Sequence, residues 1–348
     1  MKKIIILVFI LGTFFIAKAQ DNKISSPALQ EAKSLNAQVV TLFQQGKFEE
    51  ALPVAQKVVQ IREKELGRDH IETAKALTNL GFVYSSLNNQ KEAGKNLESA
   101  LEIFDKQTVA TRQENLLVAD VSERLAFIKY SFEKPQTAER LFEKALFAYE
   151  KAGEKDSLKA GKVLFSLASL QSAKRDYGKS SNLFEQVIAV RIKKLGEKHS
   201  DTIDAFDSSA CVLKKGERET EIKRIQQTYF PAAELTEDGN LKWAEDKIEK
   251  DLKPVESGVI NGKALSLPKP AYPVEARQAR ANGAVKVKVK INEQGNIVYA
   301  CGAFNGVHNA LIEASEVAAY SAKFSPTLLK GKPVKVSGII VYNFIAPR

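Results

Sequence analysis

The strongest constraint on the fold is that part of the chain repeats itself. Ile61–His70 reads IREKELGRDH, Val190–His199 reads VRIKKLGEKH, and Gly196 follows Gly67 by 129 residues (196 − 67). Small residues recur at intervals of 42, 45 and 42 positions, at Ala51, Ala93, Ala138 and Ser180. A regular period of this size is typical of stacked units that bury their apolar faces against one another. The period predicts an array of about four units.

Each unit has the pattern of two antiparallel helices. In the second unit Leu80, Gly81 and Tyr84 fall on one helical face, Asn88-Asn89 marks a turn, and Ala93 begins a second helix. The small residues allow the two helices to approach closely. This pattern resembles the tetratricopeptide repeat, in the long-linker form of kinesin light chains. We therefore predict an all-α solenoid over residues 31–213, with four repeats and a capping helix at 201–213.

Such repeats imply a binding function. By resemblance, the ligand-facing positions of the first helices lie on a concave surface, at Phe43, Phe82, Phe127, Tyr130 and Phe165. Exposed aromatic side chains are good anchors for a peptide. The alternative is that these rings pack against the helix of the next repeat. His70 and His199 occupy the same repeat position, which favours a role in the loop or at a helix start over catalysis or metal binding.

The first residues have the pattern of an export signal. A basic start precedes an apolar run of 14 residues from Ile4 to Ala17, and Ala17-Lys18-Ala19 fits the small-x-small cleavage pattern. We expect residues 1–19 to be a signal peptide, which would place the protein in the periplasm. The alternative is an uncleaved membrane anchor, although a span needs about 20 apolar residues. The formal net charge is +10, but no nucleic-acid motif accompanies it and export makes nucleic acid an unsuitable partner.

Residues 214–256 are expected to be a polar, partly helical linker between two separately folding parts. Cys211 and Cys301 lie on either side of it, and we expect two separate buried residues rather than a disulfide. Two Cys and three His offer little material for a metal site. No motif predicts a catalytic residue or a cofactor. An enzyme is therefore the less favoured class.

Residues 257–348 have the pattern of a small α+β domain with an antiparallel sheet. Ala284–Ile291 alternates valine with lysine, so the valines are expected to face a core and the lysines to face solvent. Gly295 lies in a hairpin turn that leads to a second strand. A helix follows over Asn309–Ala322, and Val334–Phe344 forms the last strand.

The order of these segments resembles the C-terminal domain of TonB, the periplasmic energy transducer, over residues 271–345. The residues that carry the resemblance are Tyr272, Pro273, Arg277, Gly283, Gly295, Phe324, Pro326, Gly331, Pro333 and Phe344. The TonB domain binds a short extended segment of outer-membrane receptors, the TonB box, by adding a strand to a sheet edge. The corresponding edge here would be Val336, Ser337, Gly338, Ile339, Ile340 and Val341. The alternative is that residues 257–267 cover this edge.

Together these observations predict a periplasmic adaptor. The repeats would bind one unidentified protein, and the C-terminal domain would pair with a TonB-dependent outer-membrane receptor. Two alternatives stay open, a membrane-anchored energy transducer and a plain scaffold without transport coupling. As a periplasmic adaptor, the protein would contact a membrane only through its partners, unless the N-terminus is uncleaved.

Overall fold

The structure is a computed structural model that describes residues 26–107, 110–131, 135–236, 241–243, 255–303 and 306–346. The expected signal peptide, and residues 237–240 and 244–254 of the expected linker, lie outside the described residues. The chain divides into two compact units, residues 1–155 and 156–348. Each unit is described by itself below.

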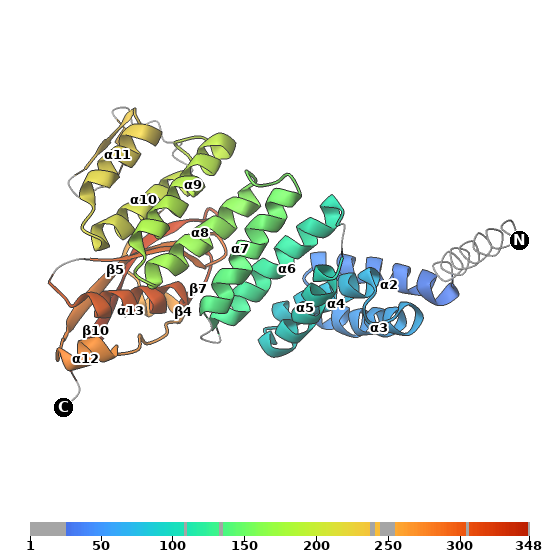
Figure 1. Cartoon of the computed structure of the whole chain (residues 1–348). Helices are drawn as coiled ribbons and strands as arrows, with labels where there is room; N and C mark the ends of the chain where they lie inside the picture. The colour runs from blue at the N-terminus through green and yellow to red at the C-terminus, as the bar shows by residue number, and fades with distance from the viewer. Residues whose placement is uncertain are drawn as a thin grey trace, which may run out of the picture. The chain divides into compact units, whose positions relative to one another are not determined.

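Helices come in consecutive pairs through residues 27–229 (Figure 1). In the first unit they are α2 (Pro27–Gln44), α3 (Phe48–Leu66), α4 (Ile71–Ser86), α5 (Gln90–Asp105), α6 (Arg112–Ser131) and α7 (Pro135–Lys151). In the second unit they are α8 (Leu158–Ala173), α9 (Tyr177–Leu195), α10 (Ser200–Lys215) and α11 (Glu219–Tyr229). The predicted helical array is confirmed. The predicted end of the array at residue 213 is wrong, because α10 pairs with a further helix, α11, and is not a single capping helix.

The helix α11 corrects the expected start of the linker. Its sequence is strongly charged, but Ile222 and Ile225 are buried. Phe230 directly after it meets Phe206 of α10 edge to face, with ring centroids 5.2 Å apart. Two well-placed isoleucines and one phenylalanine are therefore enough to hold a helix that composition alone assigns to a spacer.

The 129-residue repeat in sequence is also a repeat in local structure. Gly67 and Gly196 both adopt positive φ, at 93° and 92°, where glycine has no steric penalty. His70 and His199 each accept a hydrogen bond at Nδ1 from the backbone N–H two residues later, at 3.1 Å. The two histidines are thus helix N-caps, as their repeat position predicted.

Close helix approach explains the small residues of the repeats. A Cβ atom at Gly81 in α4 would lie 2.7 Å from the side chain of Leu97 in α5. Ala93 and Leu97 are fully buried at the same contact. Any larger residue at position 81 would push α4 and α5 apart.

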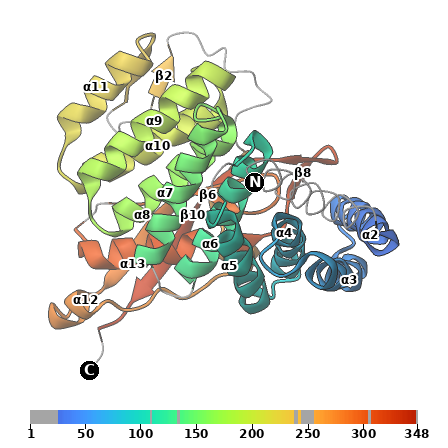
Figure 2. The ribbon, with the colours of Figure 1, turned by 45° about the vertical axis from the view of Figure 1, so that its right-hand side comes forward.

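The C-terminal domain is a four-stranded sheet with a helix on one face (Figures 1 and 2). The sheet order is β3 (Val255–Val259), β10 (Val336–Phe344), β5 (Gly283–Ile291) and β6 (Ile297–Gly302). β10, β5 and β6 are antiparallel as predicted, while β3 joins β10 in parallel. The valines of β5 are fully buried in one core with Leu311 of α13 (Asn309–Tyr320).

Several short strands were not predicted. They are β1 (Ala233–Leu235), β2 (Leu241–Trp243), β4 (Ala264–Ser266), β7 (Lys323–Phe324), β8 (Thr327–Leu329) and β9 (Lys332–Val334). A short helix, α12 (Val274–Gln278), follows Tyr272-Pro273, where the sequence predicts a helix start. β1 pairs with β2, β4 with β7, and β8 with β9. Two or three residues are too few for a periodic pattern to show in the sequence.

Candidate functional site

The aromatic residues predicted to line the repeats are neither free nor fully buried. Phe127 in α6 meets Phe142 of α7 edge to face at 5.2 Å, and Phe43 meets Phe48 in the same way. Phe127 and Tyr130 nevertheless stay 41% exposed. The rings of Phe43 and Phe127 thus each meet a ring of their own helix pair.

Phe82 and Phe165 are less accessible. Both are half-buried. Phe165, in the second unit, meets Phe184 at 5.2 Å and has the guanidinium of Arg191 5.2 Å from its ring centroid. Of the predicted ligand-facing residues in the first unit, Phe127 and Tyr130 of α6 are the most exposed, and we call these two residues the α6 aromatic pair.

Charged side chains near the predicted concave positions are engaged in packing. Lys75 lies 2.8 Å from Glu72 and 3.3 Å from Glu114. Asp120 accepts a hydrogen bond of 2.8 Å from the hydroxyl of Tyr149, which is buried. Burial first, and then this carboxylate, raise the pKa of Tyr149. These contacts join α4 to α6 and α6 to α7.

The strand predicted to be a free edge is covered in the structure. β3 pairs with β10 at Val336, Ser337 and Ile339, with a bulge between the last two. The backbone N–H of Ile260 then donates to the carbonyl oxygen of Ile339 at 3.0 Å. The alternative weighed from the sequence, cover by residues 257–267, is thus the arrangement seen.

The side chain of Asn261 extends this cover along β10 to Val341. The amide of Asn261 donates to the carbonyl oxygen of Val341 at 2.7 Å and accepts from the N–H of Val341 at 2.8 Å. This pair of bonds reproduces the contacts of a neighbouring strand. Gly338 makes room for the cover, because a Cβ there would lie 2.9 Å from Ile260, which is 2% exposed.

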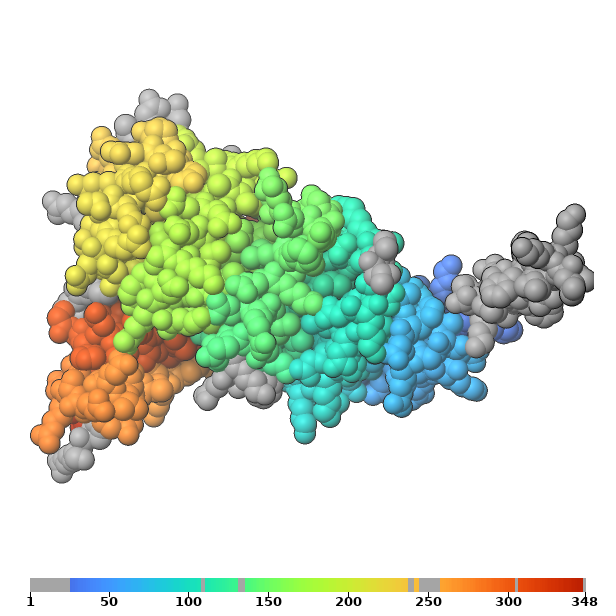
Figure 3. Space-filling view, in the orientation of Figure 1, coloured from blue at the N-terminus to red at the C-terminus, as the bar shows by residue number. Residues whose placement is uncertain are grey.

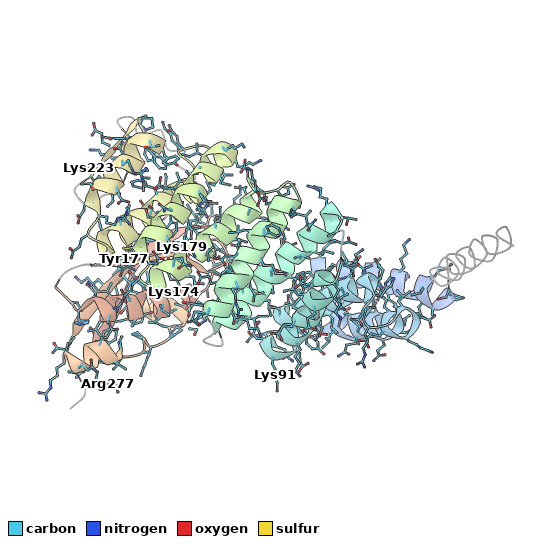
Figure 4. All side chains as sticks on the ribbon, viewed as in Figure 1. Lys91, Lys174, Tyr177, Lys179, Lys223 and Arg277 are labelled. Carbon is cyan, nitrogen blue, oxygen red and sulfur yellow. A yellow bond between two sulfur atoms is a disulfide. The ribbon has the colours of Figure 1, made fainter. Side chains whose placement is uncertain are left out.

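The residues that carry the TonB resemblance are mostly structural. The hydroxyl of Tyr272 donates to the carbonyl of Ala281, and its ring meets Phe344 at 5.7 Å. A Cβ at Gly295 would lie 1.9 Å from the carbonyl oxygen of Phe324, so only glycine fits that turn. Pro273 precedes α12, and Gly331 has a φ of 79°. Arg277 is exposed (Figure 4), and so are Pro326 and Pro333.

A disulfide joins the last helix pair to the sheet, against our expectation of two separate cysteines. Cys211 in α10 is bonded to Cys301 in β6, with Cα atoms 6.1 Å apart and a sequence separation of 90. Sequence spacing alone cannot reveal such a pairing, since the two residues meet only through the tertiary fold. The space-filling view shows the C-terminal domain directly against the helices of its own unit (Figure 3).

A buried ion pair lies beside the disulfide. Lys215 in α10 pairs with Glu316 in α13, and their side chains are only 9% and 8% exposed. The other carboxylate oxygen of Glu316 accepts from the backbone N–H of Gly302, at the outer edge of β6, at 2.7 Å. Glu316 thus satisfies two donors at once, and α10 covers the second edge of the sheet.

The opposite face of the sheet carries a second ionic contact. Lys290 in β5, predicted to face solvent, lies 2.5 Å from Asp204 and 2.7 Å from Asp207 of α10. Burial lowers the pKa of Lys290, but the carboxylates of Asp207 and Asp204 outweigh it and raise this pKa overall. Lys335 adds a third contact, with Asp201 at 2.5 Å.

These contacts define the junction, by which we mean Cys211–Cys301, Lys215–Glu316, Lys290 with its two aspartates, and Lys335–Asp201. The junction makes α8 to α11 and the C-terminal domain one compact unit. Separate folding of the C-terminal domain, which the polar linker predicted, stays a prediction.

Polar groups also line a cavity of about 360 Å³ in this unit. Arg175 contacts Glu275 at 2.7 Å and Glu313 at 3.0 Å, and Glu313 accepts from the hydroxyl of Tyr177 at 3.0 Å (Figure 4). Burial first, and then the charge of Glu313, raise the pKa of Tyr177 to about 12. Because these charges satisfy one another, we interpret the cavity as part of the contact between α8–α9 and α13.

Among the described residues, one cluster has the composition of a metal site. It consists of Cys211, Cys301 and Glu316. The sulfur atoms are bonded to each other and the carboxylate holds Lys215 and Gly302, so its ligand atoms are already engaged.

Comparison with known families identifies both parts of the chain. Residues 30–106 and 117–193 match the tetratricopeptide repeat, and residues 268–345 match the Gram-negative bacterial TonB protein C-terminal family. Both resemblances are confirmed, and the chain combines tetratricopeptide repeats with a TonB C-terminal domain. Both are protein-interaction domains. No curated protein matches the chain.

Several solved structures are similar to part of the chain. A kinesin-light-chain protein of Podosopora anserina with nearly identical TPR-like repeats is 20% identical, with a TM-score of 0.46 over 59% of this chain and 95% of that chain. BtubC (BKLC) from P. vanneervenii is 18% identical, with a TM-score of 0.46 over 61% and 85%. MamA 41-end from Desulfovibrio magneticus RS-1 is 10% identical, with a TM-score of 0.42 over 58% and 94%. We base no functional statement on these likenesses.

Within the described part of the chain, none of the helices combines the length and the apolar character that a membrane crossing needs.

Proposed function

We propose that the protein is an exported adaptor of the periplasm. Its repeats bind one protein, and its C-terminal domain takes up an extended segment of a TonB-dependent outer-membrane receptor. The protein has no catalytic role in this proposal. The disulfide supports the location, because disulfides persist in oxidising compartments such as the periplasm.

The observation that carries the proposal is the parallel pairing of β3 on β10. It indicates that the outer backbone groups of β10 accept an extended strand, here one from the same chain. β10 pairs with β5 at nine consecutive residues but with β3 at three, interrupted by a bulge. A receptor segment would take the place of β3 and leave the rest of the sheet intact.

Displacement of β3 has a cost. It removes the backbone bond from Ile260 to Ile339, both bonds of Asn261 to Val341, and the burial of Ile260. A buried isoleucine alone contributes about 1.5–3 kcal/mol. We therefore expect weak capture of a free peptide and stronger capture by variants with a loosened cover.

Substitutions in the cover test this part of the proposal. Asn261→Ala removes two hydrogen bonds at an accessible site, so it should strengthen the binding of an extended receptor peptide, measured by calorimetry. Val341→Pro removes an N–H that points toward the cover, and should abolish capture while the sheet keeps its circular dichroism. Ile340→Pro is the matched control, since its N–H points toward β5 and its loss should unfold the domain.

Envelope extracts test the partner class. The processed chain, beginning at Gln20, should retain β-barrel receptors, and the Val341→Pro variant should not. Equal recovery by both would show that the outer side of β10 is not the docking site. N-terminal sequencing of the native protein tests export, since a first residue other than Gln20 would speak for a retained anchor.

The α6 aromatic pair is the proposed anchor for the second protein. Phe127 and Tyr130 each leave a side of the ring open, and aromatic side chains of this kind dominate many interfaces. Phe127→Ala should weaken binding of that protein without affecting receptor capture. Unchanged binding would assign the pair to packing alone.

A further inference from the structure

The hairpin of β8 and β9 projects from the sheet and takes no part in the surfaces described so far (Figure 2). Its strands pair from Thr327 with Val334 to Leu329 with Lys332. Leu328 is 60% exposed and Leu329 is 56% exposed. Two adjacent exposed leucines are unusual on a short hairpin, where exposed edges normally carry charged or polar residues.

The two leucines point in opposite directions. Successive side chains of a strand alternate between its faces, so Leu328 lies on one face of the hairpin and Leu329 on the other. A rigid protein surface that covers one face leaves the other in water. A lipid interface can surround the whole tip and take up both side chains.

The charge of the tip favours an anionic surface. Lys330 and Lys332 flank Gly331 at the turn. After Glu316 the sequence contains neither Asp nor Glu, so this stretch carries only positive charge from the side chains of lysine and arginine. Lysines beside apolar residues are suited to the headgroup region of acidic phospholipids.

The backbone at the turn supports a role for the lysine itself. Lys330 and Gly331 have φ values of 51° and 79°, as a two-residue type I′ turn requires. The first position of such a turn prefers Asn, Asp or Gly, so a lysine there is conformationally unfavourable. The fold alone gives no reason for lysine at this position.

We propose that the tip of the β8–β9 hairpin, Leu328 to Lys332, binds the surface of a membrane containing anionic phospholipid, with both leucines in the interface and both lysines at the phosphates. This contact is independent of the proposed adaptor function. It departs from the expectation that the processed protein meets a membrane only through its partners.

Vesicle binding by the processed chain tests the proposal. The wild type should sediment with vesicles of phosphatidylethanolamine and phosphatidylglycerol, more weakly at high salt, and not with phosphatidylcholine alone. Each lysine near an anionic surface contributes about a fivefold change in binding, so Lys330→Asn with Lys332→Gln should weaken binding about 25-fold. The change at position 330 suits the turn, so the melting temperature should not fall.

Matched controls separate a specific tip from general positive charge. Lys286→Gln with Lys288→Gln removes two exposed lysines from β5 of the same domain and should leave vesicle binding unchanged. An equal loss in this control would overturn the proposal, because net charge would then explain the binding. Absence of any binding to the anionic vesicles would overturn it as well, in favour of an acidic protein as the occupant.

The leucines have a test of their own. Leu328→Ser with Leu329→Ser should reduce vesicle binding while both lysines remain. A tryptophan introduced by Leu329→Trp should shift its emission to the blue on anionic vesicles, whereas native Trp243, which is buried, should not respond. Full binding by the serine variant, or no shift, would show that the tip does not enter the interface.

Discussion

Removing the carboxylate of Glu316 should destabilise the second unit more than any exposed substitution. Glu316→Ala leaves the ammonium group of Lys215 at 9% exposure without its partner, and it leaves the N–H of Gly302 without an acceptor. Breaking a buried ion pair by removing one partner costs about 3–5 kcal/mol. We therefore expect a loss of that size in the free energy of unfolding.

Urea denaturation of the processed, oxidised chain measures this loss. Glu313→Ala is the matched control, since Glu313 lies on the same face of α13, one turn before Glu316. Its partner Arg175 is 47% exposed, so the control should cost about 1 kcal/mol or less. A double variant, Lys215→Met with Glu316→Leu, should recover much of the loss because no charge is then left buried.

The comparison between the two single variants can refute the reasoning. If Glu316→Ala costs no more than Glu313→Ala, the ion pair is not buried in solution. The contact between α10 and α13 would then be open to water.

Three further outcomes are expected. Replacing Cys211 and Cys301 by alanine together should lower the free energy of unfolding by about 2–4 kcal/mol, measured by urea denaturation against the oxidised wild type, because the bond closes a long loop. Phe127→Ala should cost about 1 kcal/mol, whereas Phe142→Ala at the buried side of the same ring contact should cost about 3–5 kcal/mol; equal costs would place Phe127 in the core. Burial raises the pKa of Asp201, but the hydrogen bond and charge of Lys335, and then the charge of Arg191, outweigh it and hold this pKa below 3.8. The stabilisation is therefore present above pH 3.8 and lost as the pH falls below it, and Lys335→Gln should make the melting temperature less sensitive to acid.

The sequence predicted those parts of the fold that repeat or alternate. The spacing of Gly67 and Gly196 defined the helical repeats, and the alternation in β5 defined its buried face, because both patterns follow from the geometry of regular elements. It failed for Lys290, which continues the alternation but meets two aspartates from a helix 83 and 86 residues away. Periodicity states which face a side chain lies on, but not what covers that face.

The binding surfaces were less predictable than the fold. The outer side of β10 was predicted to be a docking edge, with cover by residues 257–267 as the alternative. What decided between the two was Gly338, whose missing Cβ admits Ile260, and the side chain of Asn261. Both are single residues without a periodic signal. The same holds for Cys211 and Cys301, which meet only because α10 crosses the edge of β6.

The disulfide also determines how a mechanical load would pass through the molecule. A pull on a strand docked at β10 enters the sheet, and from β6 it reaches α10 through the covalent bond between Cys211 and Cys301. Tension therefore has a covalent path from the sheet to α10 that does not run along the polypeptide through residues 217–256. Proteolytic cleavage within residues 217–256 would leave the sheet joined to α10 by the disulfide. Reduction of one bond would reroute the load along the polypeptide backbone.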